Sequence, residues 1–350
     1  AAPSVSNAGT VSATDGQVIL AAGVGVALKN PASGSLLLNP VVSGSLIGAD
    51  NQDKTPVGVI TNSGVIDSVR GDARLLAARI DQQGIVRATT SVSRPGSIII
   101  SAQDEQAIDS AQARTGSLVL AQDSVTALLP DNNGETTISS ASASQTFQPG
   151  VINLSGATVT LQPNALIEAP GQKVTLTAIG QHDAVIAPRA VSAGLVAGRV
   201  YLDRDAAIDV AGLADIKLSV STTLVTIPRL GLNELADSPL QRNGVLYGKG
   251  IVIDSSLSGT RADGINWVGT PLANLSGYVQ QVARGIDLLL QNGGVITLAG
   301  NEVLTQSGSQ LNLDGGFIHY QGGYMPTTRL LTASGGVIDI ANADPNVNYV

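Results

Sequence analysis

Arg70, Gly71 and Asp72 form the tripeptide of this sequence whose residue types suggest the most direct chemistry. On an exposed turn, such a tripeptide presents a guanidinium group and a carboxylate, and the carboxylate can complete a metal site on an integrin-type receptor. These three residues are therefore a candidate adhesion motif. A motif of three residues is weak in a glycine-rich chain, and Leu75 and Leu76 follow it closely. The competing interpretation is a solvated corner between two structural repeats.

The densest acidic run contains Asp203, Arg204, Asp205, Asp209 and Asp215. Hard cations bind several carboxylate, carbonyl and water oxygens, but the glycine-rich nonapeptide of calcium-binding repeats is absent from the sequence. Hydrolysis of polysaccharides requires acidic groups that converge on a groove. Asp203 and Asp205 would lie on one face of a strand, which is only weak support for such a catalytic pair. We expect hydrated turn residues with a local Arg–Asp pair.

His182 and His319 are the two histidines of the chain. Neither has a second His or a Cys nearby, so the sequence does not predict a zinc site. The GxSxG nucleophile elbow and the GxxxxGK[ST] phosphate loop are both missing. The chain is therefore predicted to be no enzyme and to bind no metal and no cofactor.

A small aromatic cluster lies in the segment GGFIHYQGGYMPTT, where Phe317, Tyr320 and Tyr324 stand beside glycine turns. Aromatic rings in such positions can stack on sugars, so these residues and Trp267 are candidate glycan contacts. In the competing interpretation, the rings cover an exposed strand edge or pack against a neighbouring insert.

The composition limits the kinds of protein that can carry these residues. Of the 350 residues, 43% are hydrophobic, 13% are charged and only 3% are aromatic, with 40 Gly and no Cys. These values exclude a disordered chain, a disulfide scaffold and a thiolate metal site, and no apolar run is long enough for a transmembrane helix. The net charge of -8 argues against nucleic acid as the main partner. A core with so few rings has to be built from Val, Ile, Leu and Ala in thin layers.

One unit recurs at intervals of roughly 20 residues: a glycine turn, a short stretch rich in Val, Ile and Leu, a small polar step and a second apolar strand. Clear copies begin at Gly96, Gly116, Gly150, Gly198 and Gly293. Apolar and small polar residues alternate within each copy, which is the strand period. The sequence therefore predicts an all-β solenoid whose rungs, on the order of 13, stack about 4.8 Å apart. A β-sandwich also has many short strands, but they do not share one repeated unit.

The repeat is interrupted in the second half of the chain. Apolar residues change there to steps of four and three, which predicts a helix over about 271–291. Thr270 is in position to cap this helix, and Pro271 suits its first turn. The predicted organisation is solenoid rungs over 1–224, an insert over 225–292 whose helix packs on the solenoid, and further rungs over 293–350.

Four segments between 230 and 342 are more specific than the repeat: LADSPLQRNGVLYGKGIVID, SGTRADGINWVGTPLANLSGY, LNLDGGFIHYQGGYMPTTRL and GGVIDIANA. In these segments the chain resembles the filamentous-haemagglutinin-like large exoproteins that Gram-negative bacteria secrete by the two-partner route. The resemblance implies a right-handed parallel β-helix, export of the unfolded chain through a dedicated outer-membrane barrel, and an extracellular role at the cell surface as an adhesin or structural fibre.

Members of that family often carry an Asn-Pro-Asn-Gly signature in an N-terminal secretion domain. Here Val41 and Val42 follow Asn39 and Pro40. We therefore expect an internal or processed segment of a longer exoprotein rather than its secretion domain.

The expected function is that of an extracellular structural or adhesive rod, or a segment of a fibre, without catalysis. The expected partners are the outer-membrane secretion barrel during export, a second copy placed end to end or further rungs of the same chain, and glycans or receptors on host or neighbouring cells. The alternative is a carbohydrate-active or carbohydrate-binding β-helix protein.

Overall fold

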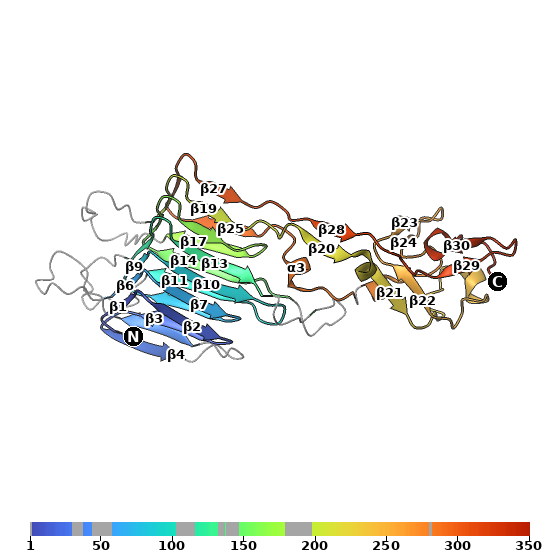
Figure 1. Cartoon of the computed structure of the whole chain (residues 1–350), viewed down its shortest axis with the longest axis horizontal. Helices are drawn as coiled ribbons and strands as arrows, with labels where there is room; N and C mark the ends of the chain where they lie inside the picture. Colours follow the sequence, from blue (N-terminus) through green and yellow to red (C-terminus); the bar gives the residue numbers. More distant parts are fainter. Residues whose placement is uncertain are drawn as a thin grey trace, which may run out of the picture. The chain divides into compact units, whose positions relative to one another are not determined.

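Figure 1 shows the computed structural model of the chain. The structure describes residues 2–29, 38–43, 58–102, 116–131, 137, 147–178, 198–279 and 282–350. Strands far outnumber helices among these residues, which form two compact units. Unit 1 contains the described residues within 1–136, 147–214 and 285–317, and unit 2 contains those within 137–146, 215–284 and 318–350.

Unit 1 is built from three sheets in which every strand is parallel to its neighbours. In the order of pairing, the first sheet contains β1 (Ser4–Asn7), β6 (Val59–Asn62), β9 (Arg79–Gln82), β12 (Ser117–Leu120), β15 (Thr158–Leu161), β18 (Arg199–Leu202) and β26 (Glu302–Thr305). The second sheet contains β2 (Thr10–Thr14), β7 (Val65–Val69), β10 (Ile85–Thr90), β13 (Val125–Pro130), β16 (Leu166–Glu168), β19 (Ala207–Asp209) and β27 (Gln310–Asn312). The third sheet contains β3 (Gln17–Ala21), β8 (Asp72–Leu76), β11 (Ser97–Ala102), β14 (Val151–Gly156), β17 (Lys173–Ala178) and β25 (Val295–Ala299).

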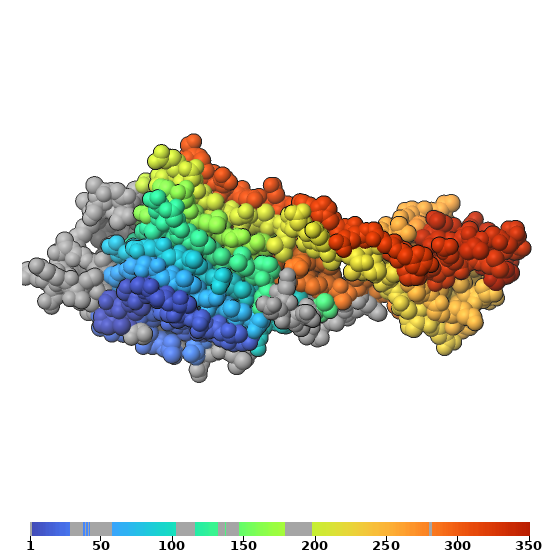
Figure 2. All heavy atoms as spheres, in the orientation of Figure 1, coloured from blue at the N-terminus to red at the C-terminus, as the bar shows by residue number. Residues whose placement is uncertain are grey.

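Successive strands of unit 1 enter the first, second and third sheet in turn, and we call each such set of three a layer. Each strand then pairs with the corresponding strand of the next layer, as β11 does with β8 and β14. The first and second sheets have seven strands among the described residues and the third has six. This is about half of the roughly 13 rungs expected, because long stretches of the chain lie outside the layers. In Figure 2 the layers appear as bands of successive colour from blue to green.

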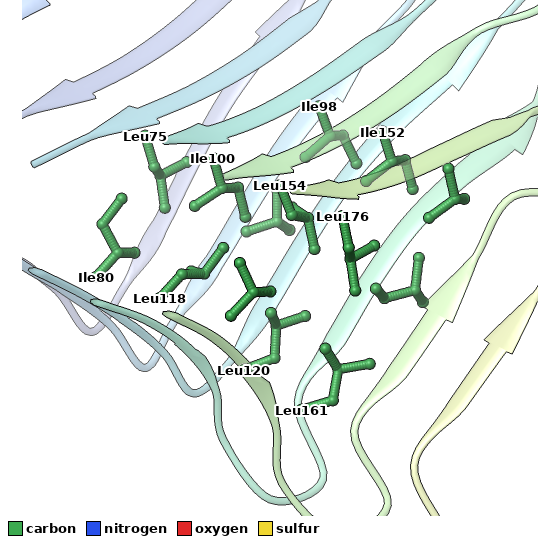
Figure 3. Packing of buried hydrophobic residues seen from close by; sticks show 14 of the residues in the cluster. Leu75, Ile80, Ile98, Ile100, Leu118, Leu120, Ile152, Leu154, Leu161 and Leu176 are labelled. Carbon is green, nitrogen blue, oxygen red and sulfur yellow. The ribbon is translucent and has the colours of Figure 1, made fainter. Parts of the chain in front are cut away.

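The core of unit 1 consists of aliphatic columns that cross the layers. Leu75, Ile100, Leu154 and Leu176 are register partners on neighbouring strands of the third sheet, and Figure 3 shows them in one row. All four are buried. Burial of one such side chain contributes about 1.5–3 kcal/mol, and the strand period places every second residue in a column. The alternation in the sequence is thus the cause of the layered core.

A polar column crosses three layers at the corner between the first and second sheets. Asn7 Nδ2 donates to Asn62 Oδ1 (2.7 Å), and Asn62 Nδ2 donates to Gln82 Oε1 (2.7 Å). Gln82 Nε2 donates to the backbone oxygen of Gly84 (2.9 Å). We call Asn7, Asn62 and Gln82, which are all buried, the polar ladder. In the next layer Leu120 occupies the same position.

The same corner changes its turn from the fourth layer onward. Asp123, Asn164 and Asp205 have φ values of 59°, 60° and 58°, and Gly308 has 89° in the last layer. This left-handed region favours Asn, Asp and Gly over other residues. Asn164 Nδ2 also donates to Asp123 Oδ1 of the layer before (3.0 Å). The acidic residues at this corner therefore serve the turn geometry.

Two long segments of unit 2 are reached from the corner between the second and third sheets. The chain departs after β19 and returns at β25, and it departs again after β27. Unit 2 contains the parallel pair β20 (Ile216–Ser219) and β28 (Ile318–Gln321), and the antiparallel pairs β21 (Leu224–Ile227) with β22 (Ile251–Asp254), β23 (Ser258–Thr260) with β24 (Asn266–Val268), and β29 (Arg329–Leu331) with β30 (Val337–Asp339). The short helices are η1 (Val220–Thr223), α1 (Pro239–Arg242), α2 (Ser276–Val279) and η2 (Ile340–Asn342) in unit 2 and α3 (Ile286–Leu289) in unit 1, where β4 (Gly25–Lys29) and β5 (Asn39–Ser43) also form a hairpin.

Two sequence predictions about this region are wrong. The single helix predicted over 271–291 is replaced by α2 and α3, because Gly285 has an extended backbone (φ −79°, ψ 176°) and starts α3 anew. The predicted rungs over 293–350 continue only to 317, since the residues from 318 belong to unit 2. Aliphatic alternation in segments such as β30 was assigned to rungs, but β30 pairs antiparallel with β29. Among the described residues, no helix is long and apolar enough to cross a membrane.

Candidate functional site

Arg70 lies in the turn between β7 and β8, where its φ of 51° is left-handed. Its backbone N–H donates to Thr89 Oγ1 of the next layer (2.7 Å). Its guanidinium group forms ion pairs with Asp15 (2.8 Å) and Asp131 (2.8 Å), and Arg94 also pairs with Asp15 (3.1 Å). The hydrogen bond from Arg70 holds the pKa of Asp15 below its usual value. Arg70 therefore ties together layers on both sides of its own.

Gly71 and Asp72 continue this corner into the interior of unit 1. A Cβ on Gly71 would overlap the backbone oxygen of Gly16 in the layer before. The Asp72 side chain accepts a hydrogen bond from Ser97 Oγ, and the residue is only 3% exposed. Burial raises the pKa of Asp72 despite the Ser97 hydrogen bond and the charge of Arg74.

The structure does not present Arg70, Gly71 and Asp72 as an exposed adhesion motif, because the carboxylate that a receptor metal would need is buried. The tripeptide is a corner between two strands, as the competing interpretation stated, although Asp72 is not solvated there. The residue types are explained by the layers: the left-handed turn, the close approach to Gly16 and the bond to Ser97.

Replacement of Asp72 by Asn is expected to flatten the dependence of stability on pH. Since the folded-state pKa of Asp72 lies above its ordinary value of 3.8, the folded chain binds this proton more tightly than the unfolded chain. The wild-type protein therefore gains stability as the pH falls from 7 through the raised pKa, and loses that contribution as the pH rises again. Asp72→Asn lacks this gain and keeps at least wild-type stability at pH 7. Calorimetric Tm values between pH 4 and 7 measure the difference, and an Asp72→Asn profile parallel to the wild type would contradict the assignment.

The five residues of the acidic run are not brought together. Asp203, Arg204 and Asp205 occupy the turn between β18 and β19, as predicted for the run, whereas Asp209 does not. The Arg204 backbone N–H donates to Asp203 Oδ1 (2.7 Å). Asp209 lies on β19, where its Oδ1 accepts a hydrogen bond from the Ala211 N–H (2.8 Å). Its Oδ2 accepts a second one from Asn312 Nδ2 of the last layer (3.2 Å). No group of three or more His, Cys, Asp or Glu among the described residues could hold a metal ion.

Asp209 and Glu168 are register partners on adjacent strands of the second sheet. Burial raises the pKa of Glu168, and the charge of Asp209 adds to this effect. Asp215 lies in unit 2, where its Oδ1 is 3.2 Å from His319 Nε2. His182 lies outside the described residues. The acidic side chains are thus distributed over two units.

The candidate glycan contacts lie on different elements. Trp267 on β24 is half-buried and stands opposite Gly259 of β23, where a Cβ would lie 2.8 Å from the indole ring. The glycine thus makes room for the ring. Tyr320 lies on β28 opposite Leu218, and it is 51% exposed. Tyr324 follows and is 78% exposed, and Phe317 before β28 is also exposed. The structure keeps Tyr320 and Tyr324 on one exposed segment and places Trp267 on another strand pair.

The layers of unit 1 end earlier than the rungs predicted up to residue 350. Val303 on β26 is 40% exposed and Leu311 on β27 is 42% exposed, whereas their register partners Val200 and Ile208 are fully buried. The last layer thus leaves the aliphatic columns uncovered by described residues. A signal was present: after Asn312 the sequence continues with Gly, Phe and Tyr instead of a third aliphatic strand.

No family model, no curated protein and no solved structure matches the chain.

The function therefore has to be argued from the chain's own geometry. That geometry offers three long parallel sheets with mostly uncharged outer faces, an exposed tyrosine segment in unit 2, and an open end of the layers in unit 1. Each of these features suits binding or support.

Proposed function

We propose that the chain is a right-handed parallel β-helix, a β-solenoid, that serves as a non-catalytic structural and adhesive rod segment of a bacterial surface exoprotein. The observation that carries the proposal is the unchanged parallel register of strands from layer to layer in three sheets. Stacked repeats of this kind form quasi-one-dimensional bodies with long faces, and they provide rigid length.

The proposal extends to the secretion route and the location. We place the chain in a filamentous-haemagglutinin-like exoprotein that leaves the cell by two-partner secretion through an outer-membrane barrel. The sequence segments between 230 and 342 support this assignment, and the absence of Cys is compatible with export of an unfolded chain. Some charged side chains on the sheets pair across adjacent layers, as Arg87 does with Asp67 (2.7 Å) and Arg199 with Glu302 (2.7 Å), and such neutralised faces suit contact with a partner.

The experiment that tests the proposal is surface labelling of the bacterium that encodes the chain. Antibodies raised against the purified chain are expected to label intact cells, and the labelling is expected to disappear when the gene for the outer-membrane transporter is deleted. Labelling that requires permeabilised cells in both strains would overturn the proposed location. Electron micrographs of the labelled material then measure whether the chain belongs to an extended fibre.

Glycan binding is a second candidate function, and the exposure of Tyr320 and Tyr324 on one segment favours it. An exposed tyrosine offers an apolar ring face together with a hydrogen-bonding hydroxyl, which suits a sugar ring. A glycan that binds the wild-type chain is expected to bind the double variant Tyr320→Ala/Tyr324→Ala at least about 10-fold more weakly, a loss of about 1.4 kcal/mol. Tyr247→Ala, at an exposed tyrosine elsewhere in unit 2, is the matched control.

A glycan array followed by titration of the best ligand measures this effect. Absence of any glycan ligand, or equal loss in the Tyr247→Ala control, would remove the candidate. Cleavage of a polysaccharide by the wild-type chain would instead favour the carbohydrate-active alternative.

A further inference from the structure

The three sheets of unit 1 end at different heights. Among the described residues, the first and second sheets have a seventh strand, β26 and β27, whereas the third sheet ends with its sixth strand, β25. Figure 1 shows β25 and β27 at this end in orange. The last layer therefore lacks one strand, and that strand would lie beside β25.

At its free edge, β25 directs backbone N–H and C=O groups to the side where a further strand would pair. Along its other edge, β25 pairs with β17, and the Val295 N–H donates to the Gln172 oxygen (2.9 Å). The N–H and C=O groups of successive residues in a parallel strand point to opposite sides. The backbone groups of Ile296 and Leu298 therefore point to the free edge.

The side chains at this edge are also incompletely covered. Ile296 and Leu298 pack only partly buried against the aliphatic core, although their partners Val174 and Leu176 are fully buried. Proteins usually protect a free edge with a charge, a proline or a bulge. The sequence of β25, VITLA, contains neither a charged residue nor a proline. This edge is suited to pairing.

End-to-end stacking of two copies does not fill the vacancy. If β3 of a second copy paired with β25, its β1 and β2 would need the positions that β26 and β27 occupy. If β1 and β2 stacked on β26 and β27 instead, one strand would still be missing between β25 and β3, because layers are about 4.8 Å apart. A single extended strand fits, and a complete copy does not.

We propose that the edge of β25 is an acceptor site for one extended polypeptide strand donated by a partner protein, which adds to the third sheet parallel to β25. This is the strand-addition mode of peptide recognition. The layers define the chemistry of the strand, since the earlier strands of this sheet carry aliphatic residues at the two inward positions: Ala73 and Leu75, Ile98 and Ile100, Ile152 and Leu154, Val174 and Leu176. The donated strand therefore has aliphatic residues opposite Ile296 and Leu298. The proposal rests on the sheets alone and does not depend on an adhesive role.

The first test uses a fluorescein-labelled peptide with the sequence of residues 171–178, GQKVTLTA, which already has the correct pattern because β17 pairs with β25. The full chain is expected to bind this peptide with a rise in fluorescence anisotropy. Saturating peptide is expected to slow hydrogen exchange of the Ile296 and Leu298 amides at least about 10-fold. A peptide N-methylated at the residue equivalent to Thr175, which would donate to the Ile296 oxygen, is expected to bind at least about 10-fold more weakly.

The second test changes the acceptor strand. Leu298→Pro removes an N–H that points to the free edge and leaves the bonds to β17 in place, a position where edge strands accept proline. This variant is expected to lose peptide binding, whereas Thr297→Ala, on the outer face of the same strand, retains it. Binding that survives Leu298→Pro, failure of the wild-type chain to bind the peptide, or edge amides already protected without peptide would each overturn the proposal. If Leu298→Pro does not fold, the N-methylated peptide and the exchange experiment decide the question.

Discussion

Gly84→Ala is expected to lower the free energy of unfolding of unit 1 by about 3 kcal/mol, the upper end of the usual cost of overpacking. A Cβ on Gly84 would overlap the backbone oxygen of Gly64 in the layer before, well inside the 3.0 Å that real Cβ atoms keep. The same oxygen accepts a hydrogen bond from the Ile85 N–H (2.9 Å), so the layers cannot separate there without loss of the ladder. Urea unfolding followed by circular dichroism measures the effect.

Gly9→Ala is the matched control for this prediction. Gly9 occupies the same corner in the first layer, and a Cβ there meets no described atom within 4 Å. This substitution is expected to change stability by less than about 1 kcal/mol, in either direction, because Ala only narrows the conformations of the unfolded chain. Equal destabilisation by the two substitutions would show that loss of glycine itself, and not the contact between layers, is responsible.

The strands and corners of unit 1 could be predicted from the sequence because each layer repeats the same local physics. Alternating aliphatic residues predict strands, and glycines such as Gly71 and Gly84 occupy turns where the backbone of the layer before passes closely. Both signals depend on adjacent residues in the sequence, so they can be read without knowing which strands lie in the neighbouring layers. The resulting all-β, parallel architecture agrees with the structure.

Features that depend on the neighbouring layer could not be predicted in the same way. Asp72 is buried because Ser97 and the chain around it lie in other layers, and a tripeptide pattern contains no information about them. The helix predicted over 271–291 failed for a similar reason, since spacing alone did not weigh the extended backbone at Gly285. The candidate glycan contacts are all aromatic, but the structure places them on different elements. Trp267, for example, lies on β24, which pairs with β23.

The polar ladder is an intermediate case. Asn7, Asn62 and Gln82 each stand two residues before a glycine in the segments NAGTV, NSGVI and QQGIV. That repetition was visible in the sequence, but only the stacking of layers shows that the three side chains form one hydrogen-bonded column. The sequence pattern predicts that the three residues occupy the same position in successive layers. The hydrogen bonds between them form because neighbouring layers lie close enough for the side chains to meet.

Asn62→Leu is expected to destabilise unit 1 by about 2–4 kcal/mol, because two buried polar groups lose their hydrogen bonds to Asn62, at about 1–3 kcal/mol each. Asn7 Nδ2 loses its short bond to Asn62 Oδ1 and keeps only the longer one to the Val65 backbone oxygen (3.4 Å), and Gln82 Oε1 loses its donor. Both residues are buried. The added aliphatic surface of Leu offsets only part of this cost. The shift of the urea midpoint relative to the wild type measures the loss.

The triple variant Asn7→Leu/Asn62→Leu/Gln82→Leu is the decisive control. Leu120, Leu161 and Leu202 already occupy this column in the next three layers and are fully buried there. Replacement of the whole ladder by Leu therefore continues an existing apolar column and removes the side-chain partners of the ladder together, so that only backbone groups such as the Gly9 N–H and the Gly84 oxygen lose a bond. The triple variant is expected to recover most of the stability that Asn62→Leu loses. If the three substitutions instead add up to a larger loss, the ladder contributes through its hydrogen bonds and not merely by satisfying its own buried groups.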